Sequence, residues 1–347
     1  MSPQEVMKLI EQAQPFIIAE MSANHNQSLE KALQIVNAAA KAGVNALKLQ
    51  TYTPDTLTID KADGEFFIHD SKSLWQGESL YNLYKKAYMP WEWHEPIFKR
   101  CREQGIVPFS TAFDATSVEL LEALGVELYK IASFEIVDIP LIQKVARTGK
   151  PILLSTGMAT VAEIHEAVCA IRETGNAHVV LLKCTSTYPS SPENSHLRTL
   201  PHMRQLFDCP VGISDHTLGI GVAVAAVALG AQVIEKHFTL SRSEGGVDAP
   251  FSLEPHEMQA LVKETRRAWQ ALGRVHYGPS RAEEDSLVFR RSLYAVQDIA
   301  EGEEFTEKNV RSIRPGHGLA PKYLKILLGR RARRAIQRGE PITWEMF

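Results

Sequence analysis

The sequence lacks a long apolar segment, a cysteine motif and a strong net charge. No run of uncharged apolar residues approaches the roughly 18 that a membrane span needs, and the first residues, MSPQEVMKLIEQAQ, are not a basic start followed by an apolar core. The four cysteines are scattered without CxxC spacing, which favours a reducing setting. The formal net charge of -3 gives no general attraction to nucleic acid. We therefore expect a cytoplasmic protein with neither a membrane nor a nucleic-acid partner.

The charge is unevenly distributed along the chain. Residues 288–347 hold 12 Lys and Arg against 7 Asp and Glu, a surplus of +5, so the first 287 residues carry 26 against 34, or -8. The basic residues of the segment GRRARRAIQR alternate with apolar ones, as on the solvent face of a strand, and we discount a nucleic-acid interface there. We expect a large domain over 1–272, a polar linker over 273–288 and a small β-rich domain over 289–347.

Eight short apolar segments with the character of buried strands alternate with helical segments before residue 273. Helix starts are indicated by Ser28 and by the capping box from Thr160 to Glu163. Eight such units with few hairpin signals favour a parallel (β/α)8 TIM barrel over an open doubly wound sheet. The strand candidates are 16–21, 46–50, 107–110, 128–131, 152–155, 179–183, 211–213 and 233–234.

Two neighbouring strand candidates run directly into histidine. The segment VGISDH ends at His216 and VIEKH ends at His237, with a helix expected over 218–229 between them. Parallel strands joined in this way lie about 5 Å apart, so the two imidazoles can reach one divalent ion. A strand-end histidine that only makes a hydrogen bond is an equally good interpretation of this local pattern.

Polar residues also stand at, or just after, the C-terminal ends of the other strands. In a barrel these positions form the face that carries active sites. Each has an ordinary interpretation, because strand-end Ser and Thr cap helices and Lys extends to solvent. Together, lysines interleaved with hydroxyls suit the binding of phosphate or carboxylate. The set is Glu20, Lys48, Gln50, Ser110, Thr111, Lys130, Ser133, Glu135, Ser155, Thr156, Lys183 and Thr185.

The connection 51–94 is rich in aromatic residues. It holds nine of the 27 aromatic side chains of the chain, and a loop of this length is usually functional or carries small elements of its own. Its rings can stack on a sugar or pack at a subunit contact. A locally packed segment without ligand contact is equally consistent with the composition.

Long motifs in this sequence resemble those of the bacterial sialic acid synthase family, whose members make nonulosonic acids. The motifs are FIIAEMSANHN, ALKLQTYTPDT, FSTAFD, YKIASFE, ILLSTGMAT, LLKCTSTYP, VGISDHTLGIG, VIEKHFTL and RSIRPGHGL, in that order. They extend from end to end of the chain. Within the family, the form SANHN and the segment SLWQGESLYNLYKKAYMPWEWH are similar to the branch that makes pseudaminic acid.

The resemblance implies a barrel followed by an antifreeze-like, or SAF, domain that swaps onto the partner's barrel in a homodimer. It implies condensation of phosphoenolpyruvate with an open-chain amino sugar, here 2,4-diacetamido-2,4,6-trideoxy-L-altrose, to give pseudaminic acid and phosphate. The alternatives within the family are an N-acetylneuraminate synthase and a legionaminic acid synthase. Outside it, the alternatives are a metal-dependent barrel aldolase or hydrolase and a non-catalytic glycan-binding protein.

The resemblance also implies roles for individual residues. A divalent ion would bind His216 and His237, with Mn²⁺ favoured over Mg²⁺ or Co²⁺, and Glu20 would handle a proton or stabilise a cation. Phosphoenolpyruvate binding is implied for Lys48, Thr111, Lys130, Ser133, Ser155, Ser186 and Ser214. Sugar binding is implied for Gln50, Tyr188, Asp248 and Arg314. Ser186 stands where the family often has asparagine, and VDAPFS around Asp248 departs from the usual glycine-proline-aspartate form.

Overall fold

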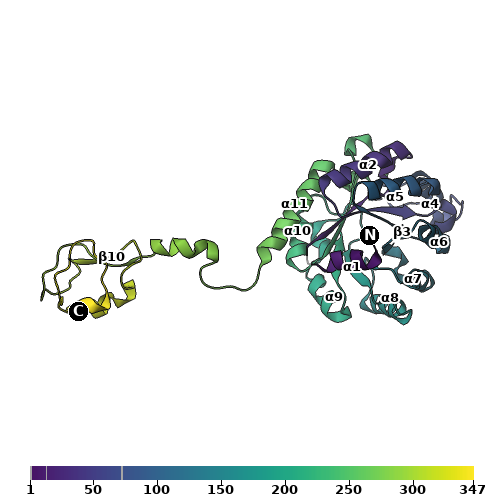
Figure 1. Cartoon of the computed structure of the whole chain (residues 1–347). Coiled ribbons are helices and arrows are strands. Elements are labelled where there is room, and N and C mark those ends of the chain that lie inside the picture. Colours follow the sequence, from purple (N-terminus) through teal and green to yellow (C-terminus); the bar gives the residue numbers. More distant parts are fainter. Residues whose placement is uncertain (1, 13, 72) are drawn as a thin grey trace. The chain divides into compact units, whose positions relative to one another are not determined.

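The computed structural model of the chain describes residues 2–12, 14–71 and 73–347. The chain divides into two compact units, Met1–Gly273 and Arg274–Phe347. The first is a closed barrel of eight parallel strands surrounded by helices (Figure 1), which confirms the predicted fold class. The strands are β1 (Phe16–Glu20), β2 (Ala46–Thr51), β3 (Val107–Ala112), β4 (Tyr129–Ile131), β5 (Ile152–Ser155), β6 (Val179–Cys184), β7 (Val211–Ser214) and β8 (Val233–His237).

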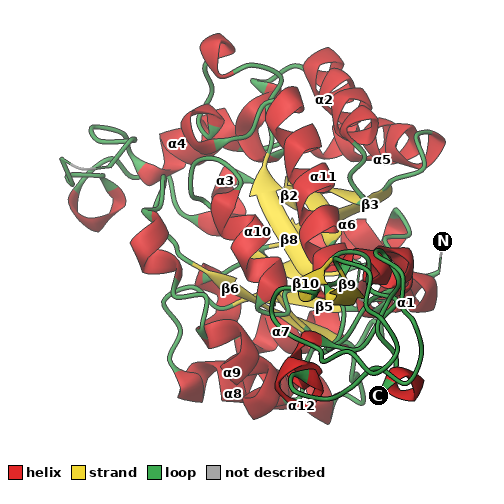
Figure 2. Ribbon diagram, turned by 90° about the vertical axis from the view of Figure 1, so that its left-hand side faces the viewer, coloured by secondary structure: helices red, strands yellow, loops and turns green. Residues whose placement is uncertain are grey.

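Helices connect successive strands and form the outer layer of the barrel (Figure 2). Two begin where the sequence predicted, since Ser28 accepts a hydrogen bond from the amide of Lys31 and the capping box of Thr160 and Glu163 is formed. The helices of this unit are α1 (Pro3–Glu11), α2 (Leu29–Ala42), α3 (Pro54–Leu57), α4 (Leu80–Ala87), α5 (His94–Glu103), α6 (Ala115–Ala123), α7 (Ile139–Ala146), α8 (Val161–Glu173), α9 (Thr199–Phe207), α10 (Gly221–Ala228) and α11 (Pro255–Leu272).

The helix between β7 and β8 begins later than the sequence predicted. We expected it from Leu218, but α10 starts at Gly221. Gly219 has a left-handed φ of 72°, which a right-handed helix does not accommodate, and residues 218–220 form a bend before the helix. The strand–helix connection is therefore a loop at the C-terminal face of the barrel.

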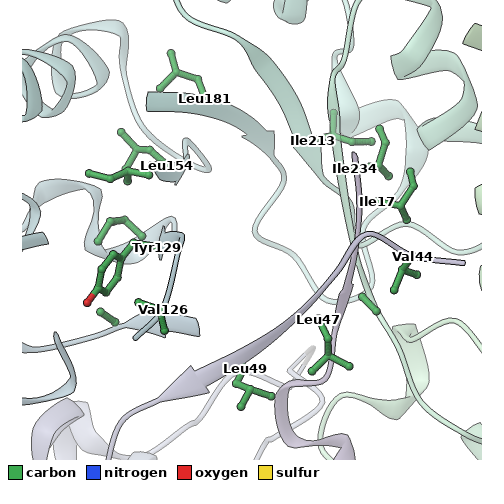
Figure 3. Packing of buried hydrophobic residues seen from close by; sticks show 14 of the residues in the cluster. Ile17, Val44, Leu47, Leu49, Val126, Tyr129, Leu154, Leu181, Ile213 and Ile234 are labelled. Atoms are coloured by element: carbon green, nitrogen blue, oxygen red, sulfur yellow. The ribbon is translucent and has the colours of Figure 1, made fainter. Parts of the chain in front are cut away.

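The barrel strands separate two cores by the alternation of their side chains. Outward-facing residues such as Leu47, Leu154 and Ile234 pack under the helices (Figure 3). Inward-facing residues form a second apolar cluster at the N-terminal end of the strands, which α1 covers with Val6, Met7 and Ile10. Its strand residues are Phe16, Ile18, Ala46, Val107, Phe109, Leu128, Leu153, Val180, Leu182 and Val233. Because the interior is packed at this end, only the C-terminal end is left for a ligand.

The second unit has a core of its own. Strands β9 (Ser292–Ala295) and β10 (Val310–Ile313) pair antiparallel, and α12 (Leu324–Leu327) packs with them. Ala332 and Ile336 are buried, whereas Arg331, Arg333 and Arg334 are exposed, as the alternation predicted. A 3-10 helix over Arg281–Phe289 occupies part of the segment predicted as a linker. None of the described helices is long and apolar enough to cross a membrane.

Candidate active site

The inward-facing positions above the apolar cluster are polar. Successive side chains of a strand point alternately into and out of the barrel. A polar residue therefore faces the interior two or four positions after an apolar residue of the inner cluster. These inward-facing polar residues are buried, except for Gln50, which is half-buried. The residues are Glu20 on β1, Lys48 and Gln50 on β2, Thr111 on β3, Lys130 on β4, Ser155 on β5, Ser214 on β7, and Glu235 and His237 on β8. The structure thus brings together most of the residues predicted from strand ends.

Two lysines and two carboxylates form a buried network in this layer. Nζ of Lys48 forms an ion pair with Glu20, donates a hydrogen bond to Oγ1 of Thr111 at 3.0 Å and lies 3.9 Å from Oε1 of Glu235. Nζ of Lys130 lies 3.3 Å from the same oxygen of Glu235, which also accepts a hydrogen bond from Ser214 at 2.8 Å. The lysine charges are therefore held in the barrel interior by partners on other strands.

Glu235 was not among the predicted site residues. The signal was present in the alternation of β8, because Glu235 lies two positions before His237 and so faces the same side of the strand. Lys183 shows the reverse error. It follows the inward-facing Leu182, points out of the barrel and donates to the backbone oxygen of Cys184. The prediction that Lys183 belongs to the anion-binding rim is therefore wrong.

The pKa values of Glu20 and Glu235 are shifted in opposite directions by their environments. Burial raises the pKa of Glu20 to about 7, against the opposing charge of Lys48. Burial also acts to raise the pKa of Glu235, but the charges of Lys130 and Lys48 outweigh it and hold that pKa below its usual value. Glu20 is thus suited to exchange a proton near neutral pH, whereas Glu235 stays ionised.

Several buried polar atoms in the layer have no hydrogen-bond partner among the described residues. They are Oε1 of Glu20, Oγ of Ser155, Oε2 of Glu235 and Nδ1 of His237. Buried polar groups are rarely left unpaired, because desolvation without a new hydrogen bond costs free energy. Their convergence at the C-terminal end of the barrel indicates the position of a polar ligand.

Ser133 and Ser186 lie on loops that follow β4 and β6, and Gly157 lies between them. The amide of Gly157 donates a hydrogen bond to Oγ of Ser133 at 3.1 Å. A methyl group on Gly157 would lie 2.7 Å from that oxygen and would also overlap Oγ of Ser186. The glycine is therefore required for the two hydroxyls to approach each other.

The imidazoles of His216 and His237 face each other at the same end of the barrel, with ring centroids 5.3 Å apart. Nδ1 of His216 donates to the backbone oxygen of Thr185 at 3.0 Å. Burial acts to lower the pKa of this ring, but the neighbouring Cys184 and the Thr185 carbonyl hold it above its usual value. Burial lowers the pKa of His237 well below its usual value, so this ring is neutral. Phe251 packs against both rings, at 4.9 Å from His237 and 6.2 Å from His216.

Two imidazoles, one of them oriented by a backbone carbonyl that leaves its Nε2 for a ligand, are in their neutral form the donor set that a first-row divalent ion prefers. Within the described parts of the chain, no three His, Cys, Asp or Glu side chains gather to hold a metal ion. These residues fit a metal with two protein ligands, whose other positions would be filled by substrate and water.

Tyr188 and Asp248 lie beside the histidine pair. The ring of Tyr188 is 4.5 Å from His216, and Oδ2 of Asp248 is 4.0 Å from Nδ1 of His237. Gln50 is half-buried on β2, opposite Thr111 of β3. Arg314 is exposed and follows β10 in the second unit, so it belongs to a different compact unit from the other predicted site residues.

The ring of Trp75, in the aromatic connection 51–94, lies at the site. Trp75 lies 6.0 Å from the ring of Tyr188, and its indole N–H donates to the backbone oxygen of Val247 at 3.4 Å. Other rings pack locally, as Tyr52 does against Tyr84 and Phe113. The sequence pattern did not distinguish Trp75 or Phe251 from the other aromatic residues, because it carries no information on loop conformation.

Comparisons with known proteins agree with this geometry. Residues 35–277 match the NeuB family, and residues 290–347 match the SAF domain. Pseudaminic acid synthase from Campylobacter jejuni is 44% identical over 327 residues, which cover 94% of this chain and 95% of that protein. Pseudaminic acid synthase from Helicobacter pylori is 40% identical over 331 residues, covering 95% and 96%. The crystal structure of a sialic acid synthetase from Leptospira borgpetersenii, in complex with citrate, is 33% identical with a TM-score of 0.70 and covers 79% of this chain and 91% of that one.

Proposed function

Because the chain belongs to the NeuB family, we propose that it condenses phosphoenolpyruvate with 2,4-diacetamido-2,4,6-trideoxy-L-altrose and water to give pseudaminic acid and phosphate. The observation that carries this proposal is the buried layer in which Lys48, Lys130 and unpaired polar atoms converge. A barrel aldolase or hydrolase that used only the two histidines would not need buried lysines. A glycan-binding protein would need neither lysines nor a carboxyl whose pKa lies near 7.

Phosphoenolpyruvate carries a phosphate and a carboxylate, and both suit this layer. The ammonium groups of Lys48 and Lys130 would form charge-assisted hydrogen bonds with these anions. Hydroxyl groups around them would complete the binding, and they belong to Thr111, Ser133, Ser155, Ser186 and Ser214. Until the substrate binds, Glu20 and Glu235 balance the lysine charges.

In the proposed reaction, C3 of phosphoenolpyruvate attacks the aldehyde carbon of the open-chain sugar, and the aldehyde oxygen gains a proton from solvent to become a hydroxyl. Water adds to C2, where cationic character has developed, and Glu20 accepts the proton that this water loses and returns it to solvent. The tetrahedral intermediate then expels phosphate by cleavage of the bond between C2 and the phosphate oxygen, and C2 becomes a ketone as its hydroxyl proton passes to the departing phosphate. Glu235 remains ionised, keeps the lysines in place and stabilises the cationic carbon.

The metal and the assembly are part of the same proposal. A divalent ion, Mn²⁺ or else Mg²⁺ or Co²⁺, would be held by His216 and His237 and would polarise the aldehyde oxygen as a Lewis acid. We further propose a domain-swapped homodimer in which Arg314 of one copy contacts the sugar in the other. The opposite charges of residues 1–287 and 288–347 favour this contact. The four cysteines are free thiols, in keeping with a cytoplasmic protein.

Product analysis with a panel of precursor sugars tests the substrate assignment. We expect phosphate release and a product of the mass of pseudaminic acid when phosphoenolpyruvate is supplied with the diacetamido-trideoxy-altrose. Omission of phosphoenolpyruvate is the control. Turnover only with N-acetylmannosamine, or only with the legionaminic acid precursor, would assign the chain to one of those alternatives. Activity without phosphoenolpyruvate would instead favour an aldolase or a hydrolase.

Replacing Gly157 with alanine should weaken phosphoenolpyruvate binding. The added methyl group overlaps the hydroxyls of Ser133 and Ser186, and the loss of one hydrogen bond to a charged group corresponds to a KM for phosphoenolpyruvate raised about tenfold. Steady-state kinetics at saturating sugar measure this KM. Gly221→Ala is the matched control, since a Cβ at Gly221 has open space around it. An unchanged KM in the Gly157→Ala variant would remove these two hydroxyls from the proposed binding site.

A further inference from the structure

Ser22 has a backbone conformation that serine rarely adopts. It comes two residues after the end of β1, its φ of 46° lies in the left-handed region that favours glycine, and it is buried. Its hydroxyl donates a hydrogen bond to Oδ2 of Asp248. The amide of Ala23 donates to the same oxygen at 3.3 Å. Backbone strain that persists in a buried segment points to a role for the residue that carries it.

The carboxylate of Asp248 is held on one side only. Both hydrogen bonds that it accepts from the described residues end on Oδ2, which leaves Oδ1 for a ligand. Oδ2 lies 4.0 Å from Nδ1 of His237, so this carboxylate stands at the edge of the histidine pair. Ser22 and Ala23 belong to the loop after β1, whereas Asp248 belongs to the loop after β8. The contact therefore joins two adjacent loops of the C-terminal face.

We propose that Ser22 is a positioning residue that orients Asp248 towards the open-chain sugar. This inference rests on the proposed function. The sugar carries hydroxyl and amide N–H donors, for which a fixed carboxylate oxygen is the matching acceptor. Without the Ser22 hydroxyl, Asp248 keeps only the amide of Ala23 and its side chain can rotate. The sugar is then bound less well, whereas the lysines that bind phosphoenolpyruvate are unaffected.

Two substitutions separate the hydroxyl from the backbone strain. Ser22→Gly removes the hydroxyl and gives the residue that favours this φ, so relief of the strain offsets part of the stability that is lost with the hydrogen bond to Asp248. The KM of this variant for the sugar should rise about tenfold, since the hydrogen bond between the misoriented carboxylate and the sugar is lost, while the KM for phosphoenolpyruvate stays unchanged. Ser22→Ala should show the same rise in sugar KM but should melt lower than Ser22→Gly, because alanine keeps the strain.

The matched control is Asp208→Gly. Asp208 also has a left-handed φ, of 49°, but it is exposed and precedes β7, at the end of the barrel opposite to the site. Relief of strain there should leave both KM values unchanged. A crystal structure of Ser22→Gly should show Asp248 turned or in two orientations, which is a readout independent of turnover.

An unchanged sugar KM together with an unchanged Asp248 side chain in the Ser22→Gly variant would overturn the inference. An equal rise in both KM values would do the same, because it would indicate a general disturbance of the barrel face. A wild-type enzyme that turns over none of the precursor sugars would contradict the proposed function instead. In that case the orientation of Asp248 in the crystal still decides whether Ser22 positions it.

Discussion

Replacing His237 with alanine should lower kcat/KM by about 10³-fold or more while the barrel stays folded. Lewis-acid polarisation of the aldehyde oxygen contributes several kcal/mol to the stabilisation of the transition state, and each 1.36 kcal/mol corresponds to a factor of about ten in rate. The fold should persist because Nδ1 of the His237 ring has no hydrogen-bond partner among the described residues, and because the apolar cluster of the barrel lies at the other end of the strands.

Three measurements check this prediction. Steady-state kinetics give kcat/KM, circular dichroism gives the fold, and titration of the metal-depleted protein with Mn²⁺ gives the metal affinity, which the substitution should abolish. His256→Ala is the control, because the side chain of His256 on α11 is 75% exposed and lies 3.9 Å from Glu254, which is not a residue of the site. Undiminished activity of His237→Ala would remove the metal from the proposed mechanism.

Replacing Glu20 with glutamine should lower kcat by a factor of about 10² to 10⁴, which is the usual contribution of a general base. Burial raises the pKa of Glu20 to about 7. The base must be ionised to accept a proton, so kcat/KM of the wild-type enzyme should rise with pH and level off above about 7. Glutamine cannot titrate at this position, so kcat/KM of the variant should not rise with pH in this range.

The fold should survive this change as well. Lys48 loses the carboxylate of Glu20 but keeps the hydroxyl of Thr111 and the charge of Glu235 at 3.9 Å. Glu20→Asp, which retains a carboxyl, should recover part of the activity and restore the pH dependence. If kcat/KM of the glutamine variant still rises with pH and levels off above about 7, the proton transfer belongs to another group.

The alternation of residues along the strands carried most of what could be predicted. Buried strand ends in FIIAE, ALKLQ and VIEKH place Glu20, Lys48 and His237 on the inner side because successive side chains point to opposite faces. The same rule could have found Glu235 and could have excluded Lys183 and Ser110, which lies between the inward-facing Phe109 and Thr111 and forms a hydrogen bond with Thr51. Those errors came from grouping all polar residues at a strand end instead of separating the two faces of the strand.

Other features do not follow from any local pattern. Trp75, Phe251 and Ser22 lie between the strands and the long helices, and each reaches the site through contacts with residues far away in the sequence, as Phe251 does with Tyr188. A loop takes its conformation from such contacts and not from a repeat in its own residues.

The sequence by itself determined that the chain is a barrel followed by a small domain, that its strand ends are polar, and that His216 and His237 lie at the same end. These features depend on periodicity and on the order of motifs, which a linear chain displays directly. Only the tertiary structure decided which polar residues pair, because Glu235 on β8 meets Lys48 and Lys130 from strands distant in the sequence. It also decided that Glu20 has a raised pKa, since burial depends on every element packed around it.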